Sequence, residues 1–313
     1  MSERRLRVLT HLPVERLGPV RDAFPEVELL WVPGEGEPPP DATGEVLLTL
    51  PWGTPNLARV LERGVRWVHA IGTGVDGFPL DQLGGRPLTC SRGASALPIA
   101  EWVLAVMLAF AKRLPETWIH APPERWSAAS LDALSGRTLG LLGIGSIGAA
   151  VAVRALPFGM RVRALRRSDR PSPVEGVELL RDLDAVLADA DHLVVALPAT
   201  PRTRHLLGVR ELARVKPGLH LVNVARGSIV DGDALRGALD DGRIALASLD
   251  TVDPEPLPAG HWMYSHPRVR LSPHVSWSMP GAFERFVACF VENLGGYLHG
   301  RPLAGLVDVA EGY

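Results

Sequence analysis

A glycine-rich turn set between a strand-like run and a helix-like run is the feature that most constrains how this 313-residue chain can fold. Residues 138–142 (TLGLL) are apolar and short enough for a buried strand. They lead into GIGSIG at residues 143–148, and AAVAVRAL at residues 149–156 then reads as an amphipathic helix. A strand, a glycine turn and a helix in this order predict the start of a doubly wound parallel sheet.

The three glycines of this turn have separate physical roles. Gly143 allows a tight turn, Gly145 has no side chain to hold a pyrophosphate away from the backbone, and Gly148 lets the new helix pack closely on the strand. Unpaired amides and the positive end of the helix dipole then favour phosphate. We expect the turn, including Ser146 and Ile147, to bind a dinucleotide; the alternative is a glycine turn that binds nothing.

Short apolar runs recur along the whole chain and predict α/β architecture with two Rossmann-like, doubly wound parallel sheets. The apolar run at residues 97–114 is long enough for a buried helix and is interpreted as the passage between two domains. A last helix, beginning near residue 282, would bring the chain back to the first domain. We therefore expect a discontinuous, flavodoxin-like substrate domain at 1–95 and 284–313 and a dinucleotide-binding domain at 96–283.

Composition excludes several other classes of protein. The chain is 46% hydrophobic with a formal net charge of −2, so it offers no general attraction to nucleic acid or to an anionic membrane. Cys90 and Cys289 are its only cysteines, too few for a disulfide framework or a zinc site, and no metal is expected. We expect a cytoplasmic protein whose partner is a small molecule.

The end of the second predicted strand, at residues 161–165, bears on the choice of cofactor. Dinucleotide-binding folds commonly place an acidic residue there for the adenosine ribose, but here the position is held by Arg166, followed by Arg167 and Ser168. These side chains can donate hydrogen bonds to a 2′-phosphate, so we predict that NADP(H) is preferred and that NAD(H) remains possible. The alternative is a solvated basic turn, because arginine is abundant throughout this chain.

Polar residues at strand ends are the candidates for chemistry, because ligands of open α/β sheets lie beyond the carboxyl ends of the strands. Arg226 follows LVNVA, Asp250 follows ALASL, and His274 follows VRLSP, while Glu255 lies in a proline-bounded loop. Hydride transfer from a dinucleotide to a 2-keto acid needs three further groups. They are a cation that holds the substrate and polarises its carbonyl, an acid that protonates the new alkoxide, and a partner that orients this acid. A guanidinium holds carboxylate and ketone oxygens together, an imidazole exchanges a proton near neutral pH, and a carboxylate orients the imidazole.

Each of these residues taken alone has a structural explanation. An arginine can hydrogen-bond to a turn, a glutamate in a loop can be a charge exposed to solvent, and a histidine near a proline can be a hydrogen-bonded side chain without a catalytic role. It is the order of Arg226, Glu255 and His274 and their placement near strand ends that favour a shared site.

Several segments resemble the D-isomer-specific 2-hydroxyacid dehydrogenases. They are LGLLGIGSIG, ALPATPRTRHLLG, ELARVKPGLHLVNVARGSIVDGDAL, SLDTVDPEPLP and LSPHVSW, and the resemblance extends over nearly the whole chain. It implies that Arg226, Glu255 and His274 form the catalytic trio and that Asp250 holds the nicotinamide carboxamide. It also implies a homodimer with a cleft that closes on binding.

The resemblance implies further ligand contacts in both domains. Expected contacts to the cofactor lie at Leu197, Pro198, Thr203, Val224 and Ala225. The segment RWVHAIGTGVDGF resembles a substrate loop whose amides near Thr73, Gly74 and Val75 would receive a carboxylate, although its glycines can also be read as shaping a turn. Trp52 and Gly53 in PWGTP and Trp277 after the histidine would favour a small, unphosphorylated substrate.

With Arg166 in place of the acidic residue, the chain resembles the glyoxylate and hydroxypyruvate reductase branch of the family, much of which prefers NADPH. The expected function is therefore NAD(P)H-dependent reduction of a small 2-keto acid to the D-2-hydroxy acid. Glu255 argues against a formate dehydrogenase, which carries glutamine as the partner of the histidine. A phosphoglycerate dehydrogenase-like enzyme and a corepressor-like, dinucleotide-sensing binding protein remain the alternatives.

Overall fold

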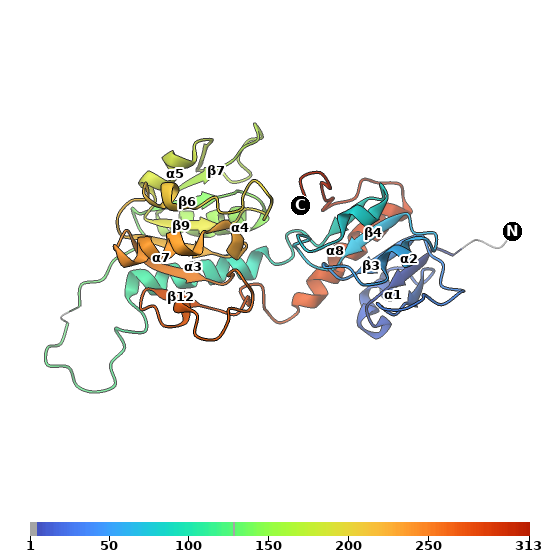
Figure 1. The fold of residues 1–313 in the computed structure, drawn as a ribbon, viewed down its shortest axis with the longest axis horizontal. Coiled ribbons are helices and arrows are strands. Elements are labelled where there is room, and N and C mark those ends of the chain that lie inside the picture. Colours follow the sequence, from blue (N-terminus) through green and yellow to red (C-terminus); the bar gives the residue numbers. More distant parts are fainter. Residues whose placement is uncertain (1–4, 128) are drawn as a thin grey trace. The chain divides into compact units, whose positions relative to one another are not determined.

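The computed structural model describes residues 5–127 and 129–313, and the chain divides into two compact units (Figure 1). Unit 1 comprises Met1–Ser95 and Met279–Tyr313, and unit 2 comprises Ala96–Ser278. The domain boundary predicted at 283/284 falls inside helix α8 (Ala282–Leu298), whereas the two units divide between residues 278 and 279. The whole of α8 therefore goes with unit 1.

Unit 1 is built on a five-stranded sheet in the order β2-β1-β3-β4-β5, in which every paired strand is parallel. Its strands are β1 (Arg7–Thr10), β2 (Glu28–Trp31), β3 (Val46–Thr49), β4 (Trp67–Ala70) and β5 (Leu88–Cys90). Its helices are α1 (Gly18–Ala23), α2 (Leu57–Leu61) and α8, with short 3₁₀ turns at Val14–Leu17 and Leu80–Leu83.

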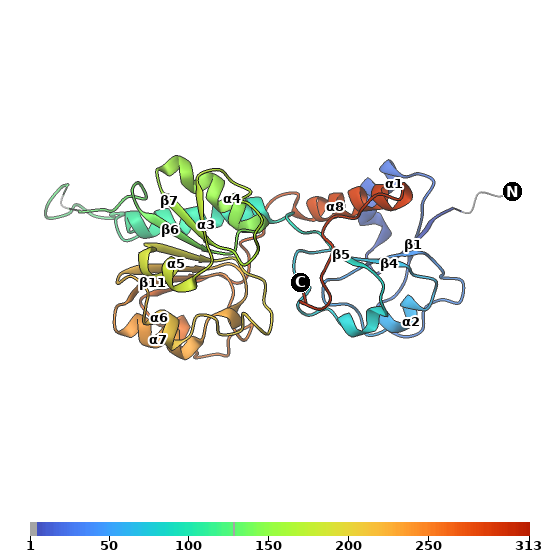
Figure 2. The same ribbon diagram turned by 90° about the horizontal axis from the view of Figure 1, so that it is seen from above.

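Helices cover both faces of this sheet, which explains why its central strands are apolar throughout. Val46 and Leu48 of β3 pack with α8, whereas Leu47 between them packs with α2, as the two-residue period of a strand requires. Figure 2 shows α1 and α8 on one face of the sheet and α2 on the other.

Unit 2 is built on a seven-stranded parallel sheet in the order β12-β11-β10-β9-β6-β7-β8. Its strands are β6 (Thr138–Leu142), β7 (Arg161–Leu165), β8 (Val177–Leu180), β9 (His192–Val195), β10 (Leu219–Asn223), β11 (Ile244–Leu249) and β12 (Val269–Leu271). The chain runs outward from β6 to β8 and then returns to β9 on the other side of β6. This reversal is the topological switch point at which such sheets bind ligands, and the glycine turn follows β6 directly.

The helices of unit 2 also lie on both faces of its sheet (Figures 1 and 2). They are α3 (Ala96–Lys112), α4 (Ser146–Ala155), α5 (Leu183–Asp189), α6 (Val209–Leu212) and α7 (Gly232–Asp240), with 3₁₀ turns at Leu156–Phe158, Gly227–Ile229 and Trp262–Tyr264. One core lies between the sheet and α3 and α4, and a second lies between the sheet and α5, α6 and α7. The predicted fold class, two doubly wound parallel-sheet domains, is confirmed.

Two features of unit 2 differ from the simple pattern of the sequence. Strand β8 was not among the predicted strands, because VELL is short, lies at the sheet edge and has no fully buried residue. Residues 113–127 and 129–137, between α3 and β6, form a long loop that reaches away from the sheet (Figure 1). Trp118 and Trp126 on this loop have exposed fractions of 64% and 77%.

Buried histidines make the stability of the fold sensitive to acid. His69 on β4 is fully buried, with Nδ1 at 2.7 Å from the Thr89 hydroxyl and Nε2 at 3.2 Å from the Ser91 hydroxyl. Burial lowers the pKa of His69 from 6.5 to about 3, and burial lowers the pKa of His192 in unit 2 from 6.5 to about 4. Both imidazoles are therefore neutral in the folded chain at pH 5 to 7, whereas in the unfolded chain they gain a proton below pH 6.5.

We expect the stability contributed by neutral His69 to be complete above pH 6.5 and to be lost as the pH falls toward about 3. The free energy of unfolding should fall by at most about 1.4 kcal/mol per pH unit for each such histidine. Calorimetric melting between pH 7.5 and 4.5 should show a shallower pH slope for His69→Gln than for the unchanged chain. His120→Gln, at an exposed position, is the matched control and should keep the original slope. Equal slopes for both variants would contradict this account.

Candidate active site

The glycine turn after β6 leaves the start of helix α4 open to a ligand. Gly143 has a φ of +99°, a conformation that side chains rarely adopt, and Gly145 precedes the first residue of α4. A Cβ at Gly148 would overlap the carbonyl oxygen of Gly143, so only glycine permits this close approach of helix to strand. A Cβ at Gly145 would meet no atom within 4 Å, so the backbone there faces open space. Ser146 is exposed and Ile147 is half-buried beside it.

The loop after β7 holds the three residues predicted to select the cofactor. Arg166 donates from Nε to the Ser168 hydroxyl at 3.0 Å and from a terminal nitrogen to the carbonyl oxygen of Pro171 at 2.6 Å. Arg181 donates to the carbonyl oxygen of Arg167 at 3.1 Å. Arg166 is half-buried, while Arg167 and Ser168 are exposed. The arginines thus fold this loop on itself and present a basic edge at the end of β7.

The loop after β9 contains Leu197, Pro198 and Thr203, all half-buried. Thr203 Oγ1 donates to the carbonyl oxygen of Pro198 at 2.7 Å and accepts from the amide of Thr200 at 2.8 Å. The hydroxyl therefore closes the loop. Since β9 adjoins β6, this loop follows the strand on the far side of the switch point from β7.

The turn that carries Arg226 is fixed by the side chain of Asn223, the last residue of β10. Asn223 Nδ2 donates to the carbonyl oxygen of Arg226 at 2.9 Å, and Asn223 Oδ1 accepts from the amide of Ala225 at 3.0 Å. The guanidinium of Arg226 donates to the Ala225 carbonyl at 2.7 Å, and Val224 and Ala225 are buried. A buried carboxamide thus sets the backbone from which the guanidinium projects.

Gly227, the next residue, packs directly against the loop that follows β11. A Cβ at Gly227 would overlap the carbonyl group of Val252 and the amide of Asp253. The turn of Arg226 and the loop that leads to Glu255 are therefore in backbone contact, and glycine is the residue that permits it.

Asp250, directly after β11, holds the turn that contains His274. Its carboxylate is buried and accepts hydrogen bonds from the Ser272 hydroxyl, from the amide of Val275 at 2.9 Å and from the amide of Ser276 at 3.0 Å. Its backbone carbonyl accepts from the amide of His274 at 3.0 Å. An ionised carboxylate has about four acceptor positions, and the bonds to the side chain use three of them.

His274 and Glu255 are in direct contact. His274 Nδ1 lies 2.8 Å from Glu255 Oε2, and Glu255 Oε1 accepts from the amide of Val252 at 3.1 Å. The two side chains are 39% and 37% exposed, and such an exposed pair contributes only about 0–1 kcal/mol to stability. The contact therefore serves to orient the ring: a carboxylate at Nδ1 favours the proton there and leaves Nε2 as the second proton-exchanging nitrogen.

The trio of Arg226, Glu255 and His274 comes from one edge of a single sheet. Strands β10, β11 and β12 are adjacent and parallel, so Arg226, Asp250 and His274 all follow the same end of neighbouring strands. Trp277 lies beside His274, because its indole nitrogen donates a hydrogen bond to the carbonyl oxygen of His274 at 2.9 Å.

The remaining predicted residues lie in unit 1, after β3 and β4. Trp52 is 65% exposed, and Gly53 beside it has a φ of +72° with a Pro79 ring where a Cβ would stand. Thr73, Gly74 and Val75 follow β4, and the Cys90 thiol donates to the carbonyl oxygen of Thr73 at 3.7 Å. Within the described part of unit 1, no hydrogen bond joins the amides of these three loop residues to another group.

Sequence reasoning missed Asn223, Gly227 and Ser272, which position the trio without chemistry of their own. Asn223 left a signal, a carboxamide at the end of an otherwise apolar strand, but its two bonds depend on the turn that follows. Over residues 5–127 and 129–313, no three His, Cys, Asp or Glu side chains gather as a metal site, and no helix has the length and apolarity to cross a bilayer.

Sequence comparison relates the chain to known reductases. Residues 104–276 match the NAD-binding domain of the D-isomer-specific 2-hydroxyacid dehydrogenases. The chain is 30% identical to glyoxylate/hydroxypyruvate reductase A of Serratia proteamaculans, over 96% of each chain. It is 35% identical to glyoxylate/hydroxypyruvate reductase B of Pectobacterium atrosepticum, over 78% of this chain and 79% of that protein.

Solved structures show the same arrangement of elements. A D-isomer-specific 2-hydroxyacid dehydrogenase from Xanthobacter autotrophicus, in complex with NADPH and MES, superposes with a TM-score of 0.86 at 29% identity, covering 99% of this chain and 100% of that one. An NADPH-dependent glyoxylate/hydroxypyruvate reductase from Sinorhizobium meliloti, in complex with NADP and sulfate, gives a TM-score of 0.82 at 26% identity, covering 98% and 100%.

Proposed function

Because the chain belongs to the D-isomer-specific 2-hydroxyacid dehydrogenase family, an NAD(P)-dependent oxidoreductase family, we propose that it reduces a small 2-keto acid of the glyoxylate or hydroxypyruvate type with NADPH. The product is the D-2-hydroxy acid. The observation that carries the proposal is the contact between His274 and Glu255 at the sheet edge that also carries Arg226. The names of the reductases from Serratia and Pectobacterium support the substrate class.

The residues of the trio divide the work of the reaction. When bound, the reduced nicotinamide supplies a hydride to the keto carbon. Arg226 binds the carboxylate and the ketone oxygen of the substrate and polarises the carbonyl. His274 gives a proton from Nε2 to the oxygen that becomes the hydroxyl. Glu255 accepts the Nδ1–H throughout, which keeps the ring in the orientation that aims Nε2 at the substrate.

The glycine turn and its neighbours fit a dinucleotide. The open space at Gly145 and the amides that begin α4 suit a pyrophosphate, and the loops with Leu197, Pro198 and Thr203 and with Val224 and Ala225 follow strands next to the switch point. Asp250, with an acceptor position left, holds the carboxamide of the nicotinamide. The basic loop after β7 holds the 2′-phosphate, which is the basis for a preference for NADP(H) over NAD(H).

In unit 1, the amides of Thr73, Gly74 and Val75 suit a carboxylate, since consecutive amides can converge on an anion. Trp52 in unit 1 and Trp277 in unit 2 are the bulky side chains that we expect to restrict the size of a ligand. The unbonded loop amides and the exposed indoles support these roles.

The proposal is tested by following NADPH oxidation with glyoxylate, hydroxypyruvate and pyruvate. We expect turnover at roughly 1 per second or faster with at least one of them. His274→Ala should lower kcat by about 10²–10⁴-fold, because the proton donor is lost, while the Kd of NADPH is unchanged. His261→Ala, a half-buried histidine elsewhere in unit 2, should keep the original kcat.

Two results would contradict this function. Unchanged turnover in His274→Ala would remove the histidine from the mechanism. Tight NADPH binding without turnover on any keto acid of the panel would favour the alternative, a dinucleotide-sensing binding protein.

The cofactor preference has its own test in the loop after β7. Arg166→Asp removes a donor to the 2′-phosphate and adds an acceptor for a ribose hydroxyl, so the ratio of kcat/KM for NADPH to that for NADH should fall about tenfold or more. Arg125→Asp makes the same change of charge on the long loop before β6 and should leave the ratio unaltered. If the two variants have the same ratio, the basic loop does not select the cofactor.

The homodimer expected from the resemblance is part of the same proposal. The exposed Trp118 and Trp126 of the long loop before β6 support a second copy as the partner that covers them, and the mass in sedimentation equilibrium tests it. The cytoplasmic location expected from the composition stays a prediction.

A further inference from the structure

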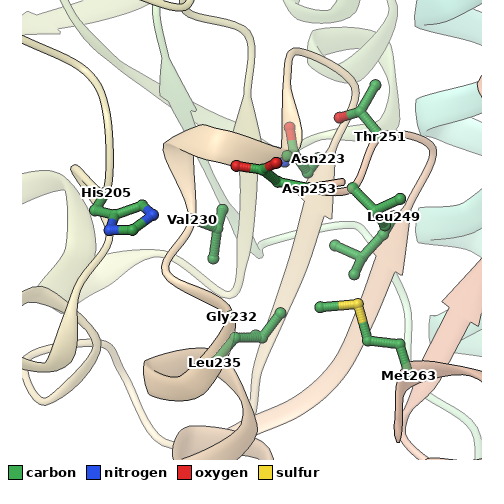
Figure 3. Close-up of a pocket in the computed structure, with 11 residues that line it drawn as sticks. His205, Asn223, Val230, Gly232, Leu235, Leu249, Thr251, Asp253 and Met263 are labelled. Atoms are coloured by element: carbon green, nitrogen blue, oxygen red, sulfur yellow. The ribbon is translucent and has the colours of Figure 1, made fainter. Parts of the chain in front are cut away.

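A small cavity lies directly behind the backbone that carries the trio. It measures about 70 Å³, is partly open to solvent, and is lined by His205, the ends of β10 and β11, the turn at 227–230, the loop at 251–253 and the side chains of Leu235 and Met263. Figure 3 shows its two ends: Asn223, Thr251 and Asp253 present oxygen and nitrogen atoms at one end, while Leu235, Leu249 and Met263 make the other end apolar. Since a water molecule occupies about 30 Å³ in the liquid, the cavity has room for about two.

One polar side chain at this cavity is buried without a partner. Thr251 is 1% exposed, and its hydroxyl makes no hydrogen bond to any residue in 5–127 or 129–313. A buried hydroxyl left in this state is destabilising, and buried polar groups are normally bonded to protein or to ordered water. Valine has nearly the same shape and would fill this position without burying an unbonded hydroxyl. The hydroxyl of Thr251 therefore indicates a hydrogen-bond partner such as an ordered water.

The polar end of the cavity offers the other partners that an internal water needs. Asn223 uses one of its two N–H groups for the Arg226 carbonyl and one of its two oxygen lone pairs for the Ala225 amide, so each of its polar atoms has capacity left. Asp253 also lines the cavity; its side chain is 46% exposed, and its carboxylate lies 3.8 Å from the Arg204 guanidinium. With the Thr251 hydroxyl these groups supply the two to four contacts typical of a buried water.

Thr251 occupies the position from which all three members of the trio are held. Asp250 before it bonds the turn that contains His274, through its carboxylate and its carbonyl. Val252 after it donates to Glu255 and packs on Gly227, the residue that follows Arg226. A shift of the backbone at Thr251 would therefore be passed on to the imidazole, the carboxylate and the guanidinium together.

We propose that the Thr251 hydroxyl binds an internal water molecule in this cavity, that the water bridges to Asn223, and that this hydrated contact makes Thr251 a positioning residue for the trio. The water joins the end of β10, which sets the turn of Arg226, to the loop after β11, which leads to Glu255. The kinetic part of the proposal rests on the proposed reductase function, whereas the water site itself does not.

A crystal structure of the full chain at high resolution tests the water site directly. We expect an ordered water within hydrogen-bond distance of Thr251 Oγ1 in the unchanged chain and in Thr251→Ser, and its loss in Thr251→Val. A dry cavity in the unchanged chain, or a Thr251 hydroxyl bonded to a protein carbonyl instead, would overturn the proposal. This result is independent of any activity, so it stands apart from a failure of the proposed function.

Kinetics test the positioning role. Thr251→Val should lower kcat with glyoxylate roughly tenfold, because a misplacement of about 1 Å can cost about 10²-fold in rate and a smaller shift of the trio should cost less. The Kd of NADPH, followed by protein fluorescence, should stay within about twofold, and Thr251→Ser should recover most of the lost kcat. A valine variant with full kcat, or a serine variant as slow as the valine variant, would show that the hydroxyl does not position the trio.

Thr138→Val is the matched control for the loss of a buried threonine hydroxyl in the same unit. Thr138 is 1% exposed at the amino end of β6, and its hydroxyl accepts from Arg161 at 2.7 Å and donates to Asp189 at 3.4 Å. Its replacement should lower the melting temperature and leave kcat unchanged. If both valine variants affect only the melting temperature, Thr251 has a structural role alone and the positioning proposal is wrong.

Discussion

The arrangement of the candidate site depends on one buried carboxylate, that of Asp250. Its oxygens accept from the Ser272 hydroxyl and from the amides of Val275 and Ser276, and its carbonyl accepts from the amide of His274. Charge-assisted bonds of this kind are about twice as strong as neutral ones, and the low exposure of Asp250 shields them from water. These bonds tie the turn after β12 to the end of β11. They hold the backbone of His274 at a φ of +54°, a conformation that residues other than glycine rarely adopt.

The contact between Glu255 and His274 has a different character from this buried network. Both side chains are more than one third exposed, so their attraction is screened and contributes little to the stability of the fold. Its direction is set instead by the backbone, because the other oxygen of Glu255 is held by the amide of Val252. The site therefore combines a buried, hydrogen-bonded support with an imidazole and a carboxylate that remain accessible to solvent, which suits the proton transfer we propose.

Much of this architecture could be predicted from the sequence, for reasons that are local. The turn at 143–148 requires glycine at Gly143 and Gly148 for a positive φ and a close approach, and the strand-end rule directs attention to Arg226, Asp250 and His274. Strand β8 could not be predicted from its apolar pattern because none of its residues is fully buried. The roles of Gly227 and Thr251 could not be predicted because they arise from contacts between segments far apart in the chain, such as Gly227 against Val252, which no local pattern encodes. Asn223 bonds only to residues two and three positions further on, and those bonds depend on the conformation of the turn that follows β10.

The central claim is that Glu255 acts through His274 as part of one catalytic unit, and a double-mutant cycle tests it most directly. kcat/KM for glyoxylate with NADPH is measured for Glu255→Gln, His274→Ala and the double variant. If Glu255 only orients the imidazole, the double variant should be no slower than His274→Ala alone, within about twofold. Losses that multiply in the double variant would contradict the account, because they would mean that the carboxylate and the imidazole act independently.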